Sequence, residues 1–160
     1  MKKTVLLLLS LPMLAGCSKT EYSPVIRADF SLNAVYEAGD FSYSCVIERM
    51  GRCVSVRATD TYAKGMTVTC DGKNVAFSYD DMEKTLAVSD VNPTNPCVVL
   101  YHVFDDVCTD QDSSAVKIDG GYQYTGTTPV GEYTLVQNED NTLSLIVIPD
   151  AGVRVTFKNT

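Results

Sequence analysis

The chain has 160 residues, 45% of them hydrophobic, and a formal net charge of −7. A chain of about 150 residues can bury close to 70% of its unfolded surface, so we expect one domain with its own core. The acidic excess repels phosphate groups. It argues against nucleic acid as a partner and against direct docking on anionic lipid, and it favours cationic partners or bound cations.

The first residues have the pattern of a secretory signal peptide. Lys2 and Lys3 form a positively charged start, and an apolar segment follows at residues 5–15. This segment is shorter than the roughly 20 apolar residues that span a bilayer, and Pro12 would interrupt a helix there. We therefore expect it to direct export and not to remain as an anchor.

The sequence Leu14-Ala15-Gly16-Cys17 resembles a bacterial lipobox. In proteins with this motif the cysteine thiol receives diacylglycerol, the preceding peptide is removed, and the new amino end is acylated. The resemblance covers residues 1–17 and implies a signal peptide at 1–16 and membrane attachment through lipid on Cys17; the alternative is an ordinary signal with a chance cysteine. In this family Ser18, in place of an aspartate, implies the outer membrane of a Gram-negative bacterium.

The expected mature chain begins with a short polar segment at residues 17–24, which we interpret as a tether. At about 3.5 Å per residue it reaches no more than roughly 25 Å, so the domain at 25–160 is expected close to the membrane. Loss of the signal, with Lys2 and Lys3, changes the formal net charge from −7 to −9.

From residue 25 onward the apolar residues recur with a period of two, in short segments rich in β-branched and aromatic residues, which predicts β-strands. We expect strands at 25–32, 41–47, 53–59, 66–70, 74–79, 85–89, 97–104, 115–118, 132–137, 142–148 and 153–158. No window has the period of an amphipathic helix. Turn signals such as Asp71-Gly72 separate the strands, which indicates a sandwich or a barrel.

The sequence Pro-Val-Gly-Glu-Tyr-Thr-Leu at 129–135 resembles the turn-and-strand segment of prealbumin-like and related Ig-like surface domains. The resemblance implies an all-β, single-domain antiparallel β-sandwich, Ig-like or prealbumin-like, in which the glycine makes the turn and the tyrosine packs at the corner. Some members form an isopeptide bond through a glutamate. Gln137 stands at that position here, so we do not expect such a bond to Asn159.

Five further cysteines follow Cys17, and an exported location permits disulfides. They are Cys45, Cys53, Cys70, Cys97 and Cys108. The odd number leaves at least one thiol unpaired. Alternation places Cys45 and Cys53 on opposite faces, which argues against that bridge, whereas Cys45 could pair with Cys70 across the core. Cys97 could pair with Cys108 if the chain turns back, and the alternative for each cysteine is a small buried hydrophobe.

The only histidine, His102, falls in the strand expected at 97–104, beside two carboxylates. The sequence nominates neither a serine in an elbow motif nor an exposed cysteine to act with it, so we expect no nucleophilic catalysis and no enzyme. A carboxylate-dependent hydrolase remains the alternative. It would need two acidic residues about 5 to 9.5 Å apart on one concave wall.

One acidic loop could bind a cation. Asp105, Asp106, Asp110 and Asp112 lie within a few residues of one another, and calcium takes oxygen ligands from closely spaced carboxylates. The loop lacks the glycine and the final glutamate of an EF-hand. We expect a solvated turn and no cofactor, with calcium as the alternative.

These features together predict a lipid-anchored lipoprotein of the cell envelope that acts as a non-enzymatic binding or structural module for a protein or a glycan. An inhibitor of a cationic secreted enzyme is a second possibility, because the chain is acidic. In line with the inhibitor hypothesis, Tyr43-Ser44-Cys45 resembles a segment of the lysozyme-inhibitor lipoproteins. The carboxylate-dependent envelope hydrolase is the third.

We predict that Cys17→Ala leaves the precursor without lipid, because the thiol is the acceptor of the diacylglycerol. The variant should move from the detergent phase to the aqueous phase in a detergent partition assay, whereas Ser18→Ala should stay in the detergent phase. Unchanged partitioning of Cys17→Ala would contradict the lipobox interpretation.

Overall fold

The computed structural model describes residues 26–109 and 115–158. The expected signal peptide at 1–16, Cys17 and the tether at 17–24 lie outside these residues, as do Asp110 and Asp112. No helix in the described part of the chain is both long enough and apolar enough to cross a bilayer.

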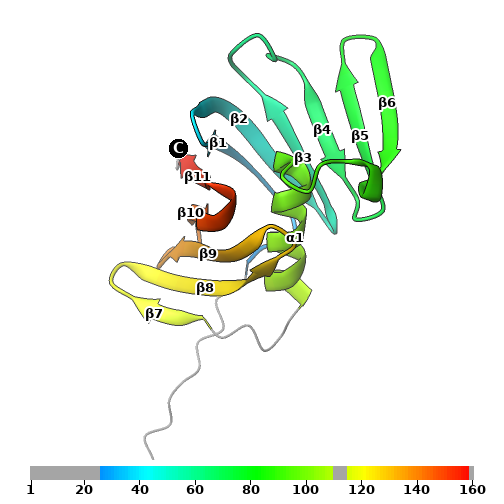
Figure 1. The fold of residues 1–160 in the computed structure, drawn as a ribbon. Coiled ribbons are helices and arrows are strands. Elements are labelled where there is room, and N and C mark those ends of the chain that lie inside the picture. Colours follow the sequence, from blue (N-terminus) through cyan, green and yellow to red (C-terminus); the bar gives the residue numbers. More distant parts are fainter. Residues whose placement is uncertain (1–25, 110–114, 159–160) are drawn as a thin grey trace, which may run out of the picture.

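The strands form one antiparallel sheet of 11 strands (Figure 1). They are β1 (Phe30–Ala38), β2 (Phe41–Met50), β3 (Cys53–Ala58), β4 (Thr67–Cys70), β5 (Asn74–Tyr79), β6 (Met82–Ala87), β7 (Val116–Ile118), β8 (Gly121–Thr128), β9 (Gly131–Asn138), β10 (Leu143–Ile148) and β11 (Val153–Lys158). Their order is β6-β5-β4-β3-β2-β1-β11-β10-β9-β8-β7. The first and last strands therefore pair in the middle of the sheet, and β6 and β7 are its edges.

The period-two pattern predicted most of these strands. In β11, Val153, Val155 and Phe157 are buried and the residues between them are exposed, as the alternation predicted. The prediction missed β8, whose sequence has two glycines and several polar residues. It also began the first strand too early, since β1 starts at Phe30.

The single α-helix of the described residues is α1 (Pro96–Thr109), so the strand predicted at 97–104 is wrong. Asn95 Oδ1 accepts a hydrogen bond of 3.0 Å from the backbone N–H of Cys97. Pro96 suits the first position of a helix, because the backbone N–H that proline lacks would have no acceptor within the helix there. Eight residues of the helix are buried: Cys97, Val98, Val99, Leu100, Tyr101, Val103, Phe104 and Val107. Because they lie on almost every side of the helix, the sequence shows no single apolar stripe.

The sheet curls round α1, which contacts β3 and β4 on one wing and β8 on the other (Figure 1). The predicted Ig-like or prealbumin-like sandwich is not confirmed, because the described strands form one sheet and not two. The helix replaces the second sheet as the layer that covers the concave face. A helix that is apolar on almost every side can bury its side chains here only if both wings close on it.

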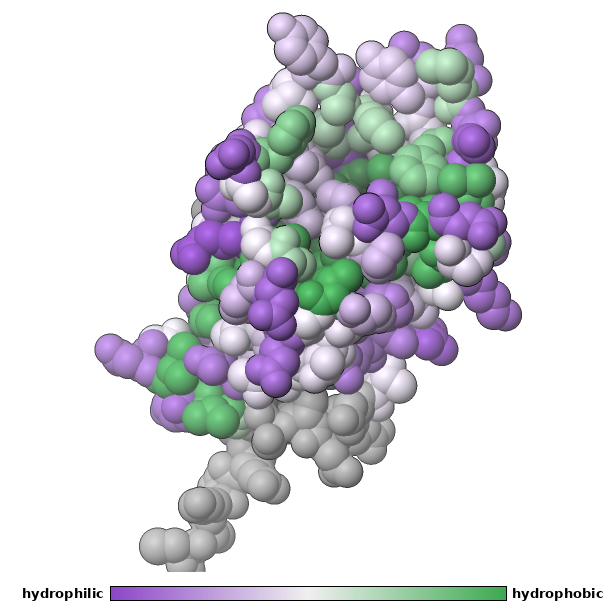
Figure 2. All heavy atoms as spheres, viewed as in Figure 1, coloured by the Kyte–Doolittle hydropathy of each residue, from purple (hydrophilic) through white to green (hydrophobic). Residues whose placement is uncertain are grey.

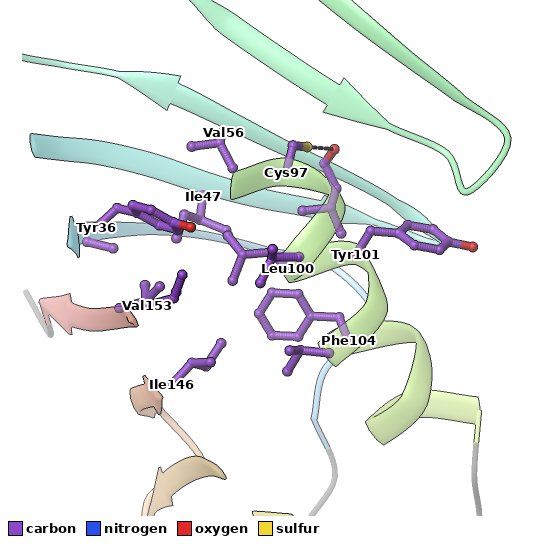
Figure 3. Close-up of a cluster of buried hydrophobic side chains, with 14 of the residues drawn as sticks. Tyr36, Ile47, Val56, Cys97, Leu100, Tyr101, Phe104, Ile146 and Val153 are labelled. Carbon is purple, nitrogen blue, oxygen red and sulfur yellow. Dashed lines mark hydrogen bonds between the residues drawn. The ribbon is translucent and has the colours of Figure 1, made fainter. Parts of the chain in front are cut away.

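Side chains from the helix and the concave face form one core (Figure 3). Leu100 and Phe104 of α1 lie with Ile47, Ile146 and Val153 of the sheet, and all of these residues are buried. The core therefore joins strands from both halves of the chain.

Two neighbouring carboxylates connect α1 to opposite wings. Asp105 Oδ1 lies 2.9 Å from Nη2 of Arg52, in the turn between β2 and β3. Asp106 Oδ2 accepts a hydrogen bond of 2.6 Å from the Tyr133 hydroxyl on β9. A Cβ at Gly126 on β8 would overlap both Asp106 and Tyr133, so the glycine leaves room for this contact.

We predict that Tyr36→Phe keeps or increases the free energy of unfolding. The Tyr36 hydroxyl is buried without a hydrogen-bond partner among the described residues, and burial raises its pKa to about 12. Loss of an unpartnered hydroxyl should leave stability unchanged or add about 1 kcal/mol, as measured by urea denaturation. The control is Tyr133→Phe, which removes a hydrogen bond and should cost about 1 kcal/mol. A comparable decrease in the free energy of unfolding of Tyr36→Phe would contradict the prediction.

Candidate functional site

An apolar pocket of about 210 Å³ lies between the concave face of β2–β5 and the start of α1. The residues that line it are Phe41, Tyr43, Val56, Ala58, Thr61, Ala63, Met66, Val68, Phe77, Asn95 and Pro96. None of them carries a charge. In Figure 2, apolar side chains are visible over this wing of the sheet, bordered by polar ones.

The strand alternation brings the lining side chains to one face. Val56 and Ala58 point inward from β3 between residues that point outward. Val56 is the register partner of Val68, which in turn pairs with Phe77, so these three side chains form a row across the floor of the pocket. The helix begins at Pro96, and the part of the concave face beyond its first turn is left uncovered.

One wall of the pocket is the connection between β3 and β4, at residues 59–66. Backbone hydrogen bonds hold it at both ends, from Ala58 N to Met66 O (3.0 Å) and from Gly65 N to Ala58 O (2.9 Å). Gly65 has a φ of +93°, a conformation that suits glycine. Ala58 and Ala63 are small, and the space that larger residues would fill stays open as the pocket.

Large apolar side chains are exposed around the mouth of the pocket. Phe41 is 74% exposed. A second hollow of about 530 Å³ adjoins the pocket, and the two share Met66 and Phe77. Met82, on the far side of this hollow, is 66% exposed. Methionine side chains are flexible and polarisable, so they suit surfaces that adapt to a ligand.

Two titratable groups in or beside the pocket, Tyr43 and Cys45, are neutral. Burial is the main cause that raises the pKa of the Tyr43 phenol well above its usual value. Burial likewise raises the pKa of the Cys45 thiol to about 11, so it is protonated at neutral pH. No carboxylate lines the pocket, and the paired acids required by the hydrolase alternative are not found in it.

The acidic residues proposed as metal ligands do not converge in the described part of the chain. Asp105 and Asp106 belong to α1 and not to a loop, and each already has a partner, Arg52 and Tyr133 respectively. Asp110 and Asp112 lie outside the described residues. Among residues 26–109 and 115–158, no cluster of histidine, cysteine and acidic side chains could hold a metal ion.

The predicted disulfide pairings do not fit the fold, and the five cysteines described are free thiols. Cys97 and Cys108 lie on one helix, about 16 Å apart along its axis. Cys45 and Cys70 lie on β2 and β4, with β3 between them, which puts them about 10 Å apart or more. A disulfide spans at most about 7 Å between Cα atoms.

Cys97 is a small buried group, as the alternative interpretation predicted. Its Sγ donates a hydrogen bond of 3.0 Å to the carbonyl oxygen of Val54 (Figure 3). His102 lies on α1 and not on a strand, and it is half-buried. Burial lowers its pKa, and the nearby Asp105 opposes that shift.

The sequence prediction did not identify the pocket residues. Two signals were present, since Phe41 and Met82 each follow an acidic turn directly and turns are usually polar. The pocket itself combines residues from β2 to α1, which the pairing of neighbouring strands and the position of the helix start bring together.

Comparison with known proteins finds similarity at the level of solved structures. No family model matches the chain, and no curated protein matches it. A LolA superfamily protein from Nitrosomonas europaea has a similar solved structure, with a TM-score of 0.42 and 10% sequence identity, covering 87% of this chain and 88% of that chain.

We predict that calcium does not stabilise the protein. A cation that binds only the folded form raises the melting temperature, by several degrees at a hundredfold excess over its dissociation constant. Because Asp105 and Asp106 are already engaged, melting temperatures in millimolar calcium and in chelator should agree within about a degree. A clear rise in calcium, abolished by Asp110→Asn with Asp112→Asn, would identify a metal site.

Proposed function

We propose that the protein is a lipid-anchored, non-enzymatic binding module of the cell envelope, which holds an apolar side chain of a partner protein in the pocket beside α1. The observation that carries the proposal is the uncharged pocket of about 210 Å³ on the concave face, with Phe41 exposed at its mouth. Ligand sites in proteins are commonly concave and mostly apolar, with few polar groups.

The size of the pocket favours a single apolar group. An apolar cavity of about 150 Å³ stays dry and binds benzene. A pocket of about 210 Å³ therefore fits one aromatic or branched aliphatic side chain. Burial of such a group contributes about 1.5 to 3 kcal/mol.

The chemistry of the lining favours a protein over a glycan. Outside Tyr43, the polar side chains that line the pocket are those of Thr61 and Asn95. Asn95 Oδ1 already accepts a hydrogen bond from the helix start, so little remains to bind sugar hydroxyls. A buried hydroxyl without a partner costs about 1 to 3 kcal/mol.

The lipobox sequence supports the location. Lipid on Cys17 and a tether that reaches no more than roughly 25 Å would keep the pocket near the surface of the membrane. A partner would then be another envelope protein or an exported protein that passes close to that surface.

The experiment is the binding of the neutral fluorescent probe N-phenyl-1-naphthylamine to the protein. Ala58 lines the pocket and is 7% exposed, so Ala58→Leu places extra methyl groups inside it. We predict that this variant binds the probe about tenfold more weakly. That change corresponds to about 1.4 kcal/mol of lost burial.

The matched control is Ala76→Leu. Ala76 lies on β5 between Val75 and Phe77, so it faces away from the pocket on the same wing. The Ala76→Leu variant should bind the probe with the same affinity as the unaltered protein. An equal loss of probe affinity in both variants, or unchanged probe affinity in Ala58→Leu, would contradict the assignment of the pocket.

A further inference from the structure

The strand β6 is a free edge of the sheet. It hydrogen-bonds β5, and no described strand pairs with its other side. It has 6 residues, whereas the opposite edge β7 has 3. An edge strand of this length presents a row of backbone donors and acceptors to solvent.

The register identifies which backbone groups face outward. Val88 N donates to Lys73 O at 2.9 Å, in line with the β5–β6 pairing. Because hydrogen-bonded residues alternate along an antiparallel pair, Met82, Lys84 and Leu86 bond to β5. The N–H and C=O groups of the intervening residues, Glu83, Thr85 and Ala87, point away from the sheet. All three residues are exposed, and no backbone partner for these groups is found among the described residues.

Apolar side chains lie directly beside this edge. Met82 is the register partner of Tyr79, so both lie on the face of Phe77. With Met66 they contribute to the hollow of about 530 Å³. A strand added to β6 would direct every second side chain towards this hollow.

The charges around the edge are mainly negative. Asp80, Asp81 and Glu83 are exposed at the tip of the β5–β6 hairpin or next to it, and Lys84 is the one basic residue of β6. The mature chain is also acidic as a whole, since its formal net charge changes from −7 to −9 when Lys2 and Lys3 are lost. The field at the edge therefore attracts cations.

We propose that β6 binds an extended segment of a partner protein, in which basic and apolar residues alternate, as an added β-strand. The added backbone bonds the outward groups of Glu83, Thr85 and Ala87, the apolar residues enter the hollow beside Met82, and the basic residues lie on the opposite face with Glu83. In strand addition, main-chain hydrogen bonds supply affinity and the pockets for alternate side chains supply specificity. This inference rests on the proposed function, in which the ligand is a protein.

Charge argues against a second copy of the chain as the occupant. An antiparallel pair of β6 strands centred on Thr85, whose backbone groups point outward, would set Asp80 of one copy opposite Asp90 of the other. Those side chains are exposed and acidic. Like charges placed opposite each other destabilise a strand pair.

The test uses a short synthetic peptide of alternating lysine and leucine, with the lipidated protein in non-ionic detergent, measured by fluorescence anisotropy. We expect binding that weakens as salt rises, and binding at least about tenfold weaker for a peptide with glutamate in place of lysine. Peptides methylated on the backbone nitrogen of either the leucines or the lysines provide the decisive comparison. One set of N–H groups faces β6 and the other faces solvent, so one methylated peptide should lose about tenfold or more in affinity and the other should keep it.

A protein variant provides an independent test. Thr85→Pro removes an outward N–H without loss of a bond to β5, and proline is tolerated on edge strands. Thr85→Pro should lower the affinity for the lysine–leucine peptide about tenfold. Thr85→Val should bind this peptide with an affinity within about twofold of that of the unaltered protein. Circular dichroism melting checks that both variants are folded, and the methylated peptides do not depend on either variant.

Four results would overturn the proposal. They are no binding of the lysine–leucine peptide at millimolar concentration, equal binding of the glutamate peptide, equal effects of the two methylations, and a dimer that Thr85→Pro dissociates, which would assign the edge to a second copy. The naphthylamine probe reports the pocket beside α1 separately. Failure of the peptide with intact probe binding would remove strand addition and leave the proposed function in place.

Discussion

The burial of α1 is the constraint on which the rest of the structure depends. The helix carries apolar side chains on almost every side, and a flat sheet could cover only one of them. The sheet therefore curls until β3 and β4 meet the helix on one side and β8 meets it on the other. The helix is shorter than the concave face that surrounds it. The helix starts at Pro96, and it does not cover the part of the β2–β5 face that lies past this end. The pocket lies on that uncovered part.

Polar contacts orient the helix but contribute less to its stability than burial does. The Arg52 side chain is 70% exposed, and an ion pair of that kind contributes about 1 kcal/mol or less. Fully burying one leucine or phenylalanine contributes about 1.5 to 3 kcal/mol, and α1 buries Leu100 and Phe104 completely. Asp105 and Asp106 point to opposite wings, so together they fix the rotation of the helix about its axis.

The sequence predicted the strands where one face is buried and the other is in water, as in β11. It failed for α1, because valines and other apolar residues in succession resemble a buried strand as much as a buried helix. The helix signal that was present is local: Asn95 followed by Pro96 is typical of a helix start. The pocket could not be predicted from the sequence, since it depends on how far α1 extends along the concave face. Many short strands predicted a sandwich, which is not confirmed, because the described strands form one sheet that curls round the helix.

A curled single sheet leaves two edges that a closed barrel would not have, and edges of this kind invite pairing between copies of a protein. The edge β7 is short, and its length limits such pairing. The longer edge β6 is bordered by Asp80, Asp81 and Glu83, which lie near one end of the strand, and by Asp90 near the other end, so an antiparallel second copy would bring acidic residues together. The repulsion acts only between like charges, so it does not oppose the approach of a basic chain. The acidity of the domain thus discourages self-association at β6 while leaving its backbone groups free for a partner of opposite charge.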